Sequence, residues 1–109
     1  MENFFYDIAL PLPLRQSFTY QHNDKLAKGT RVVVPFRNRK LVGYVLRKKT
    51  NSKIKSIKRI EKVLDEYSLL DIASCDLINW ISDYYKAPIG EVYKSFFPPL
   101  LRKGNSIDN

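Results

Sequence analysis

The sequence is poor in the residues that build covalent scaffolds, metal sites or nucleotide loops. Its 109 residues include one cysteine and one histidine, which excludes an internal disulfide and a cysteine–histidine zinc site within this chain. None of its four glycines lies in a Gly-x-x-x-x-Gly-Lys loop, so a P-loop for ATP is also excluded. No apolar stretch approaches the ~20 residues that span a bilayer. We therefore expect no cofactor, no metal and no membrane partner.

Catalytic groups are equally scarce. The single histidine, His22, lies in a polar, turn-like stretch and is expected at the surface. Cys75 lies within a predicted helix, where a structural role is expected. Because no acid–base pair or nucleophile is visible, the isolated chain is not expected to be an enzyme. The first fifteen residues lack a basic start and a long apolar run, which predicts a cytoplasmic protein without a signal peptide.

Charge is abundant and unevenly distributed. The chain carries a formal net charge of +8 and a pI near 9.7. Residues 28–62 contain thirteen lysines and arginines and one acid, whereas residues 63–91 contain six acids and one base. Such a two-sided field orients a negatively charged partner, either nucleic acid or an anionic membrane. The imbalance of residues 28–62 favours binding of nucleic acid or another polyanion.

Apolar and β-branched runs predict a sheet in the first half of the chain. Strands are expected over residues 4–9, 17–20, 30–36, 41–47 and 57–64. Residues 37–40 form the polar turn of a hairpin, and Gly43 suggests a bulge or bend in its second strand. The spacing within residues 57–64 also suits a helix, but the neighbouring strands favour a strand.

The second half of the chain predicts a helix over residues 68–85. Apolar side chains recur there at three- and four-residue spacing: Ala73, Leu77, Ile81 and Tyr84 or Tyr85. Ser68 or Asp71 is expected to cap its start, and Pro88 and Gly90 to end it. Residues 91–97 form one or two further turns before Pro98-Pro99.

These elements predict one small domain of the α+β class. We expect a small antiparallel, barrel-like sheet of about five or six strands, similar to an OB fold, followed by a packed α-helix. The domain is expected to cover residues 1–102. Residues 103–109 are expected to be a polar tail or the start of a linker.

Aromatic residues accompany the bases in the predicted strands: Phe18, Tyr20, Phe36 and Tyr44. Rings that stack on bases, beside cations that hold phosphates, are typical of sites for single-stranded nucleic acid. At least half of these rings are expected to pack in the core instead. A different interpretation is a protein-interaction domain whose acidic helix, residues 69–85, docks a basic partner through Trp80, Tyr84 and Tyr85, although core packing is favoured for those rings.

Four ordered motifs resemble the start of primosomal protein N′ (PriA), the replication-restart helicase family. Ile8-Ala-Leu-Pro-Leu-Pro-Leu14 with Phe18-Thr-Tyr20 is similar to its opening. Gly29-Thr-Arg-Val-Val-Val-Pro-Phe36 with Leu41-Val-Gly-Tyr-Val45 is similar to its hairpin. Lys58 with Val63-Leu-Asp65 resembles its lysine and Val-Leu-Asp strand. Trp80-Ile-Ser-Asp-Tyr-Tyr85, followed by Pro88-Ile-Gly90 and Phe97-Pro98, resembles its Trp-x-Ala-x-Tyr-Tyr and Pro-x-Gly segment.

The resemblance implies a DNA-binding domain with a pocket for the 3′-terminal nucleotide. Phe18 would stack on or wall that nucleotide, and Lys58 would hold a phosphate. Thr19 stands where the family has aspartate, and Arg37 where it has glycine, so we expect a reshaped pocket in which Arg37 holds a phosphate. The adjoining basic face would comprise Arg39, Lys40 and Arg59.

The resemblance also implies a role within a longer protein. The domain would capture the 3′ end of the nascent leading strand at a stalled fork, without sequence specificity. The 3′-to-5′ helicase, with its ATP, magnesium and zinc sites, would lie downstream, and single-strand-binding protein and other primosome proteins are possible partners. The alternative is a generic single-stranded DNA- or RNA-binding β-barrel without 3′-end selectivity.

Overall fold

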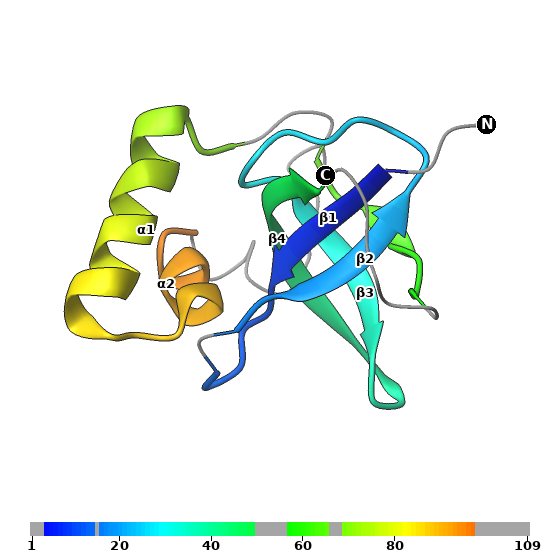
Figure 1. The fold of residues 1–109 in the computed structure, drawn as a ribbon, viewed down its shortest axis with the longest axis horizontal. Coiled ribbons are helices and arrows are strands. Elements are labelled where there is room, and N and C mark those ends of the chain that lie inside the picture. The colour runs from blue at the N-terminus through cyan, green and yellow to red at the C-terminus, as the bar shows by residue number, and fades with distance from the viewer. Residues whose placement is uncertain (1–3, 15, 50–56, 66–68, 98–109) are drawn as a thin grey trace.

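The computed structural model describes residues 4–14, 16–49, 57–65 and 69–97. Its elements follow in the order β1 (Phe4–Ala9), β2 (Phe18–His22), β3 (Arg31–Phe36), β4 (Arg39–Lys49), β5 (Lys62–Val63), α1 (Ile72–Tyr85) and α2 (Ile89–Ser95). The strands form one antiparallel sheet in the order β2-β1-β4-β3-β5. The two helices pack on one side of this curled sheet (Figure 1). The predicted α+β, OB-like fold is confirmed.

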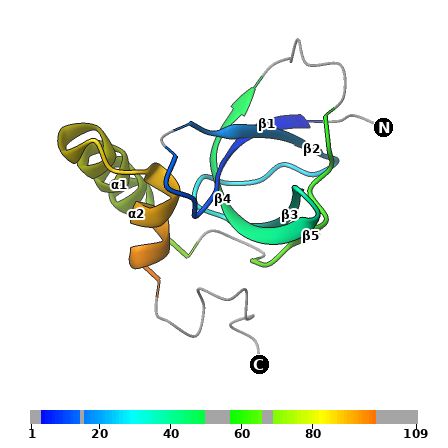
Figure 2. The same cartoon turned by 90° about the horizontal axis from the view of Figure 1, so that it is seen from below.

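A short parallel seam brings the two edges of the sheet together. The N–H of Gln21 in β2 donates to the carbonyl of Lys58 at 3.1 Å, and the N–H of Ile60 donates to the carbonyl of Gln21 at 2.9 Å. The same segment continues along β3, where the N–H of Glu61 donates to the carbonyl of Val33 at 2.8 Å. The strands therefore curl into a ring, as the view from below shows (Figure 2). Residues 57–60 against β2 are called the seam below.

The inside of the ring is filled by alternate side chains of its strands. This first core contains Tyr6, Ile8, Leu10, Tyr20, Val32, Val34, Val45 and Ile60. Gly43 lets β4 approach β1 closely, since a β-carbon there would lie 2.5 Å from Cγ2 of Ile8. The predicted bulge is wrong in its position. The register shift lies between Asp7 and Ile8, whose β4 partners are Arg47 and Val45.

A second core lies between the outer face of the sheet and the helices. Tyr44 of β4 stacks on Tyr93 of α2 with ring centroids 5.3 Å apart, and on Phe97 at 5.4 Å. Cys75 of α1 is buried in this core, and burial raises the pKa of its thiol. Cys75 therefore has the environment of a structural cysteine. None of the helices in the described residues is long and apolar enough to cross a membrane.

Helix α1 presents a different face to the core from the one predicted. Its buried residues are Cys75, Ile78 and Ser82, whereas the predicted core residues Leu77, Tyr84 and Tyr85 are exposed by 47%, 66% and 66%. Trp80, also expected in the core, is 55% exposed. The prediction is wrong because α1 packs mainly against α2, which lies between it and the sheet. The buried hydroxyl of Ser82 is accommodated by donating to the carbonyl of Ala87 at 2.7 Å.

The ends of α1 follow local hydrogen bonding. Asp71 caps its start, because its carboxylate accepts from the N–H of Ser74 at 2.8 Å, and this bond lowers the pKa of Asp71. The helix ends at Tyr85, because the next residue, Lys86, has a left-handed φ of 56°. Pro88 and Gly90 therefore do not end α1. They begin α2, where a β-carbon on Gly90 would lie 1.7 Å from the carbonyl oxygen of Leu10.

Two further sequence-based boundaries change. The hairpin turn is only Arg37 and Asn38, with φ values of 48° and 63°, so β4 begins at Arg39. Strand β2 extends to His22. The His22 side chain was expected at the surface, but it is only 17% exposed. Its Nδ1 accepts a hydrogen bond from the N–H of Asp24 at 3.1 Å. Ser68, residues 50–56 of the lysine-rich loop, Pro98-Pro99, the boundary at 102 and the tail over 103–109 lie outside the described residues.

Candidate nucleic-acid interface

A hollow of about 290 Å³ opens at the hairpin end of the barrel, between β2, β3 and the seam. It is lined by Phe18, Thr19, Tyr20, Pro35, Phe36, Arg37 and Lys58. The structure thus brings together all four residues that the family resemblance assigned to a pocket, although they are spread over 41 positions of the chain. Curling of the sheet explains this, because β2 and the seam become neighbours only when the edges meet.

The walls of the hollow are aromatic and held in place. Phe18 and Phe36 meet edge to face, with centroids 5.1 Å apart and planes at 72°. The hydroxyl of Tyr20 donates to the carbonyl of Pro35 at 2.8 Å, which ties β2 to the end of β3. Burial raises the pKa of Tyr20, so this hydroxyl stays protonated and able to donate. The two phenylalanines therefore flank the hollow as fixed apolar surfaces.

Two cations stand at its rim. Arg37 occupies the first position of the hairpin turn, and its guanidinium lies over the Phe36 ring, 5.3 Å from the centroid. Lys58 lies on the seam with an exposed side chain, while its main-chain carbonyl is fixed by the bond from Gln21. The hollow thus combines ring faces for a base with cations for phosphates.

Thr19 lines the hollow with its main chain. In a strand, successive side chains point to opposite faces, and the neighbouring Phe18 and Tyr20 pack toward the barrel core. The Thr19 hydroxyl lies instead on the outer face, where it donates a long 3.4 Å bond to the carboxylate of Asp7. Its N–H and C=O point the same way as those of Gln21, which bond to the seam. Thr19 therefore offers backbone groups, which any residue here supplies.

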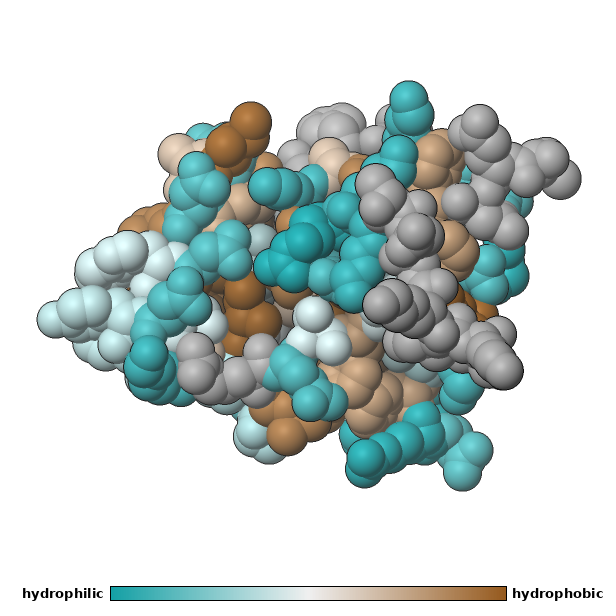
Figure 3. Space-filling view, in the orientation of Figure 1, coloured by the Kyte–Doolittle hydropathy of each residue, from teal (hydrophilic) through white to brown (hydrophobic). Residues whose placement is uncertain are grey.

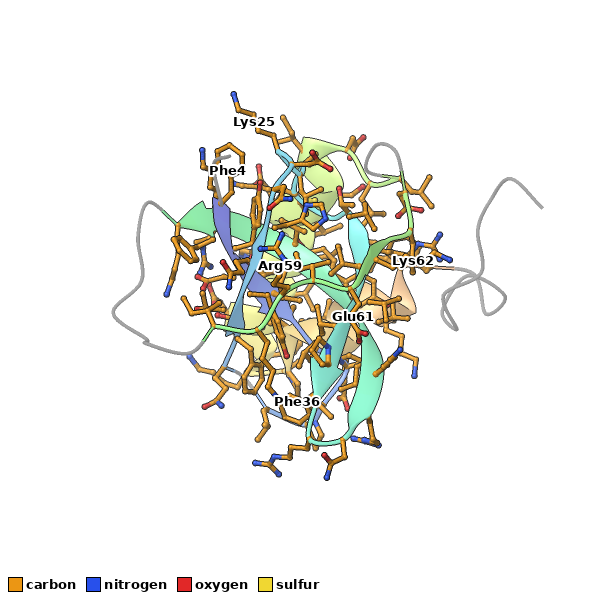
Figure 4. The ribbon with its side chains drawn as sticks, turned by 90° about the vertical axis from the view of Figure 1, so that its right-hand side faces the viewer. Phe4, Lys25, Phe36, Arg59, Glu61 and Lys62 are labelled. Atoms are coloured by element: carbon orange, nitrogen blue, oxygen red, sulfur yellow. The ribbon has the colours of Figure 1, made fainter. Side chains whose placement is uncertain are left out.

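The rest of the predicted basic face surrounds the hollow. Arg39 and Lys40 begin β4 and are exposed, and Lys40 pairs with Glu61 at 3.3 Å. In Figure 3, hydrophilic side chains gather at the tip of this hairpin, at the bottom of the view. Arg59 projects from the segment that crosses the barrel wall between Phe36 and Phe4 (Figure 4), and its guanidinium donates to the side-chain oxygen of Asn23.

Several bases of the positive stretch serve structure instead. Arg31 is fully buried and donates from Nε to Oδ2 of Asp65 at 3.0 Å and from Nη2 to Oδ1 at 2.7 Å. Arg47 and Lys49 share the buried carboxylate of Asp7, at 2.7 and 3.3 Å. Counting charges along the sequence missed these pairs. The position of Arg31 before three consecutive valines was the available signal, since such a run marks a buried strand.

The four aromatic candidates divide evenly. Tyr20 and Tyr44 are core residues, 4% and 0% exposed, although Tyr20 also borders the hollow. Phe18 and Phe36 are partly buried and line the hollow. The expectation that at least half would pack in the core is therefore confirmed. Within the described residues, no group of three histidine, cysteine or acidic side chains is arranged to hold a metal ion.

Known proteins are similar to this chain over most of its length. A family model described as a 3′ DNA-binding domain (3′BD) of PriA matches residues 7–98. The replication restart protein PriA of Buchnera aphidicola from Acyrthosiphon pisum is 35% identical over 106 residues, which is 94% of this chain and 15% of that protein. PriA of Haemophilus influenzae is 35% identical over 103 residues, 91% of this chain and 14% of that protein.

The chain therefore spans about one seventh of the length of these relatives. The match covers the hairpin, the seam and both helices, and so includes every residue that lines the hollow. Matches of this coverage and identity establish the family. The chain belongs to the 3′ DNA-binding domain family of the replication restart protein PriA.

Proposed function

We propose that this domain holds the free 3′ end of a DNA strand in the hollow between Phe18 and Lys58. It would capture the 3′ end of the nascent leading strand at a stalled or repaired fork in the bacterial cytoplasm. It would thereby direct a longer, ATP-dependent helicase to that fork. The domain itself would bind DNA and catalyse no reaction. The observation that supports this proposal is a small hollow that is lined by two phenylalanine rings and by two exposed cations, Arg37 and Lys58.

The size of the hollow supports selectivity for a strand end. Its volume of about 290 Å³ lies at the lower end of small-molecule sites. The base of a terminal nucleotide would stack against Phe18 while Arg37 and Lys58 hold phosphates. An internal nucleotide carries a further phosphate on its 3′ side, which apolar walls would exclude. Base sequence would not be recognised, because stacking and phosphate contacts carry little base information.

Titration of matched oligonucleotides tests this proposal. Short single strands of one sequence, ending in a 3′-hydroxyl or a 3′-phosphate, are compared by calorimetry at one salt concentration. We expect clearly tighter binding of the 3′-hydroxyl strand. Equal dissociation constants would instead support the alternative, a generic single-strand-binding barrel without end selectivity.

A substitution at Phe18 tests whether the bound 3′ end lies in the hollow. Phe18→Ala should weaken binding of the 3′-hydroxyl strand by roughly 1–3 kcal/mol, the value of one base–aromatic stack. Tyr85→Ala is the matched control, since it removes an exposed ring of similar size on α1. A melting curve confirms that both variants are folded. Equal affinity of Phe18→Ala and the unchanged protein would remove Phe18 from the site.

A second role is favoured by the exposed aromatic face of α1. Trp80 and Tyr84 stack on each other with centroids 4.9 Å apart, yet are 55% and 66% exposed. Large rings exposed together mark interaction surfaces, and Asp76 and Asp83 lie on the same helix. We propose that this face docks a basic surface of the remaining domains of the longer protein.

Charge reversal tests the docking role. Asp76→Lys should weaken association of this domain with the separately expressed remainder of the protein, and leave oligonucleotide binding unchanged. Asp24→Lys, a reversal at another exposed aspartate, on the barrel, is the matched control and should leave association intact. Undiminished association of Asp76→Lys and of Trp80→Ala would overturn the docking role.

A further inference from the structure

A second aromatic–cationic pair lies at the end of the barrel opposite the hollow. Lys48, near the end of β4, places its ammonium over the ring of Phe4 in β1, 4.3 Å from the centroid. Phe4 is partly buried and Lys48 is exposed. Figure 4 shows Phe4 and Lys25 at one end of the barrel and Phe36, which lines the hollow, at the other. Both ends thus offer a ring beside a cation.

Strand β2 connects the two ends, with one cation, Arg59, beside it. Strand β2 runs from Phe18, at the hollow, to His22, which pairs with Phe4. At ~3.3 Å per residue, these four steps cover about 13 Å, the length of roughly four stacked nucleotides at ~3.4 Å each. Arg59 pairs with Gln21 beside this strand, and lies between Phe36 and Phe4 in Figure 4. The spacing suits a single strand that continues from the hollow along the seam.

We infer that Phe4 and Lys48 form a second nucleotide subsite, which receives a base and a phosphate of the strand a few nucleotides before its 3′ terminus. This inference rests on the proposed function of the hollow. An exposed cation–π pair is weaker than a base–aromatic stack. A base therefore displaces the ammonium of Lys48 from the Phe4 ring, and its flexible stem moves the charge to a neighbouring phosphate.

The charges around this end favour a polyanion. Lys25 is exposed on the neighbouring loop, and Arg59 is exposed on the seam side. The same loop carries Asp24, whose side chain is 79% exposed and lies 4.0 Å from His22. Arg47 and Lys49 flank Lys48 but are paired with Asp7. Lys48 therefore supplies the cation that is placed directly at the ring.

The subsite predicts that affinity depends on strand length. Oligothymidylates of two and eight nucleotides with free 3′-hydroxyls are titrated into the 109-residue chain by calorimetry. The unchanged protein should bind the eight-nucleotide strand (the octamer) more tightly than the two-nucleotide strand (the dimer). Phe4→Ala should weaken octamer binding about five-fold or more, the lower limit for one lost stack. Lys48→Glu replaces the cation that holds a phosphate with an anion and should also weaken octamer binding. Both variants should leave dimer binding unchanged.

Matched variants separate this subsite from general charge effects and from the hollow. Lys94→Glu makes the same charge change on α2 and should keep the octamer within two-fold of its original affinity. If Phe4→Ala does not fold, the exposed Lys48→Glu decides alone. Unchanged octamer binding by Lys48→Glu, equal losses for dimer and octamer, or an equal loss in Lys94→Glu would overturn the subsite.

The failure of the proposed function has a different signature. If a 3′-phosphorylated dimer binds as tightly as the 3′-hydroxyl dimer, end selectivity fails, whatever the length dependence. If end selectivity holds and affinity does not rise with length, only the second subsite fails.

Discussion

The hydroxyl of Thr19 lies 3.4 Å from the carboxylate of Asp7, on the outer face of the sheet and away from the hollow that the Thr19 main chain lines. The resemblance to the family had suggested a change of chemistry here, because threonine replaces an aspartate. The geometry indicates instead that the side chain at this position acts on the stability of the β1–β2 pair.

Thr19→Asp should therefore alter stability more than recognition. It places a second carboxylate directly opposite Asp7, and like charges across strands are unfavourable. We expect a loss of about 1 kcal/mol in the free energy of unfolding, with an unchanged ratio of affinities for 3′-hydroxyl and 3′-phosphate strands. Thr19→Ser serves as the control. A marked rise in that ratio for Thr19→Asp would show that this side chain does reach the terminus.

Arg37→Gly should stabilise the folded domain and at the same time weaken its binding to DNA. Arg37 holds a left-handed φ of 48°, which costs a side-chain residue more than glycine. Glycine should therefore raise the free energy of unfolding by up to about 1 kcal/mol, while binding weakens because one phosphate contact is lost. The slope of log affinity against log salt should fall by ~0.7. An unchanged slope would mean that Arg37 contacts no phosphate.

Gly90→Ala should destabilise the domain strongly. Its β-carbon would lie 1.7 Å from the carbonyl oxygen of Leu10, a main-chain atom that cannot move alone. Helix α2 would have to separate from β1, with a loss of about 3 kcal/mol. Urea denaturation measures this loss. Lys86→Ala, which changes an exposed residue at the end of α1, is the comparison. A loss below ~1 kcal/mol would contradict the close approach.

The buried pair of Arg31 and Asp65 should show strong coupling. Asp65→Asn alone leaves the guanidinium buried without a counter-charge, and we expect a loss of about 3–5 kcal/mol. The double variant Arg31→Met with Asp65→Leu removes both charges and should recover most of that loss. A double-mutant cycle of unfolding free energies, built from Arg31→Met, Asp65→Leu and the double variant, measures the coupling. Additive effects of the two changes would contradict the pairing.

The sequence predicted the elements better than the faces of α1. The strand type of residues 57–64 followed from their neighbours, although only Lys62–Val63 pairs as a regular strand. Helical spacing could not select the buried face, because Leu77, Tyr84 and Tyr85 also recur at helical spacing yet are exposed, whereas the polar Ser82 is buried. Which face is buried depends on how α2 is placed against α1, and that placement is a tertiary property.

The candidate site was predicted residue by residue from family motifs, yet its geometry was not. Nothing in the order of residues 18, 37 and 58 indicates that they meet, since the contact arises when the seam closes the sheet. For the same reason, the chain sequence could not show that Thr19 contributes its backbone, or that Arg31 and Arg47 serve as internal counter-ions.

The closing seam also determines when the molecule gains its site during folding. The hollow joins three segments, in β2, at the end of β3 and in the seam, and each lies about twenty residues from the next along the chain. No short fragment of the chain therefore contains it, and contacts of such sequence separation form late. A partly folded chain would still attract polyanions through its lysines and arginines, whereas discrimination between strand ends would emerge all at once, as a cooperative property of the finished barrel.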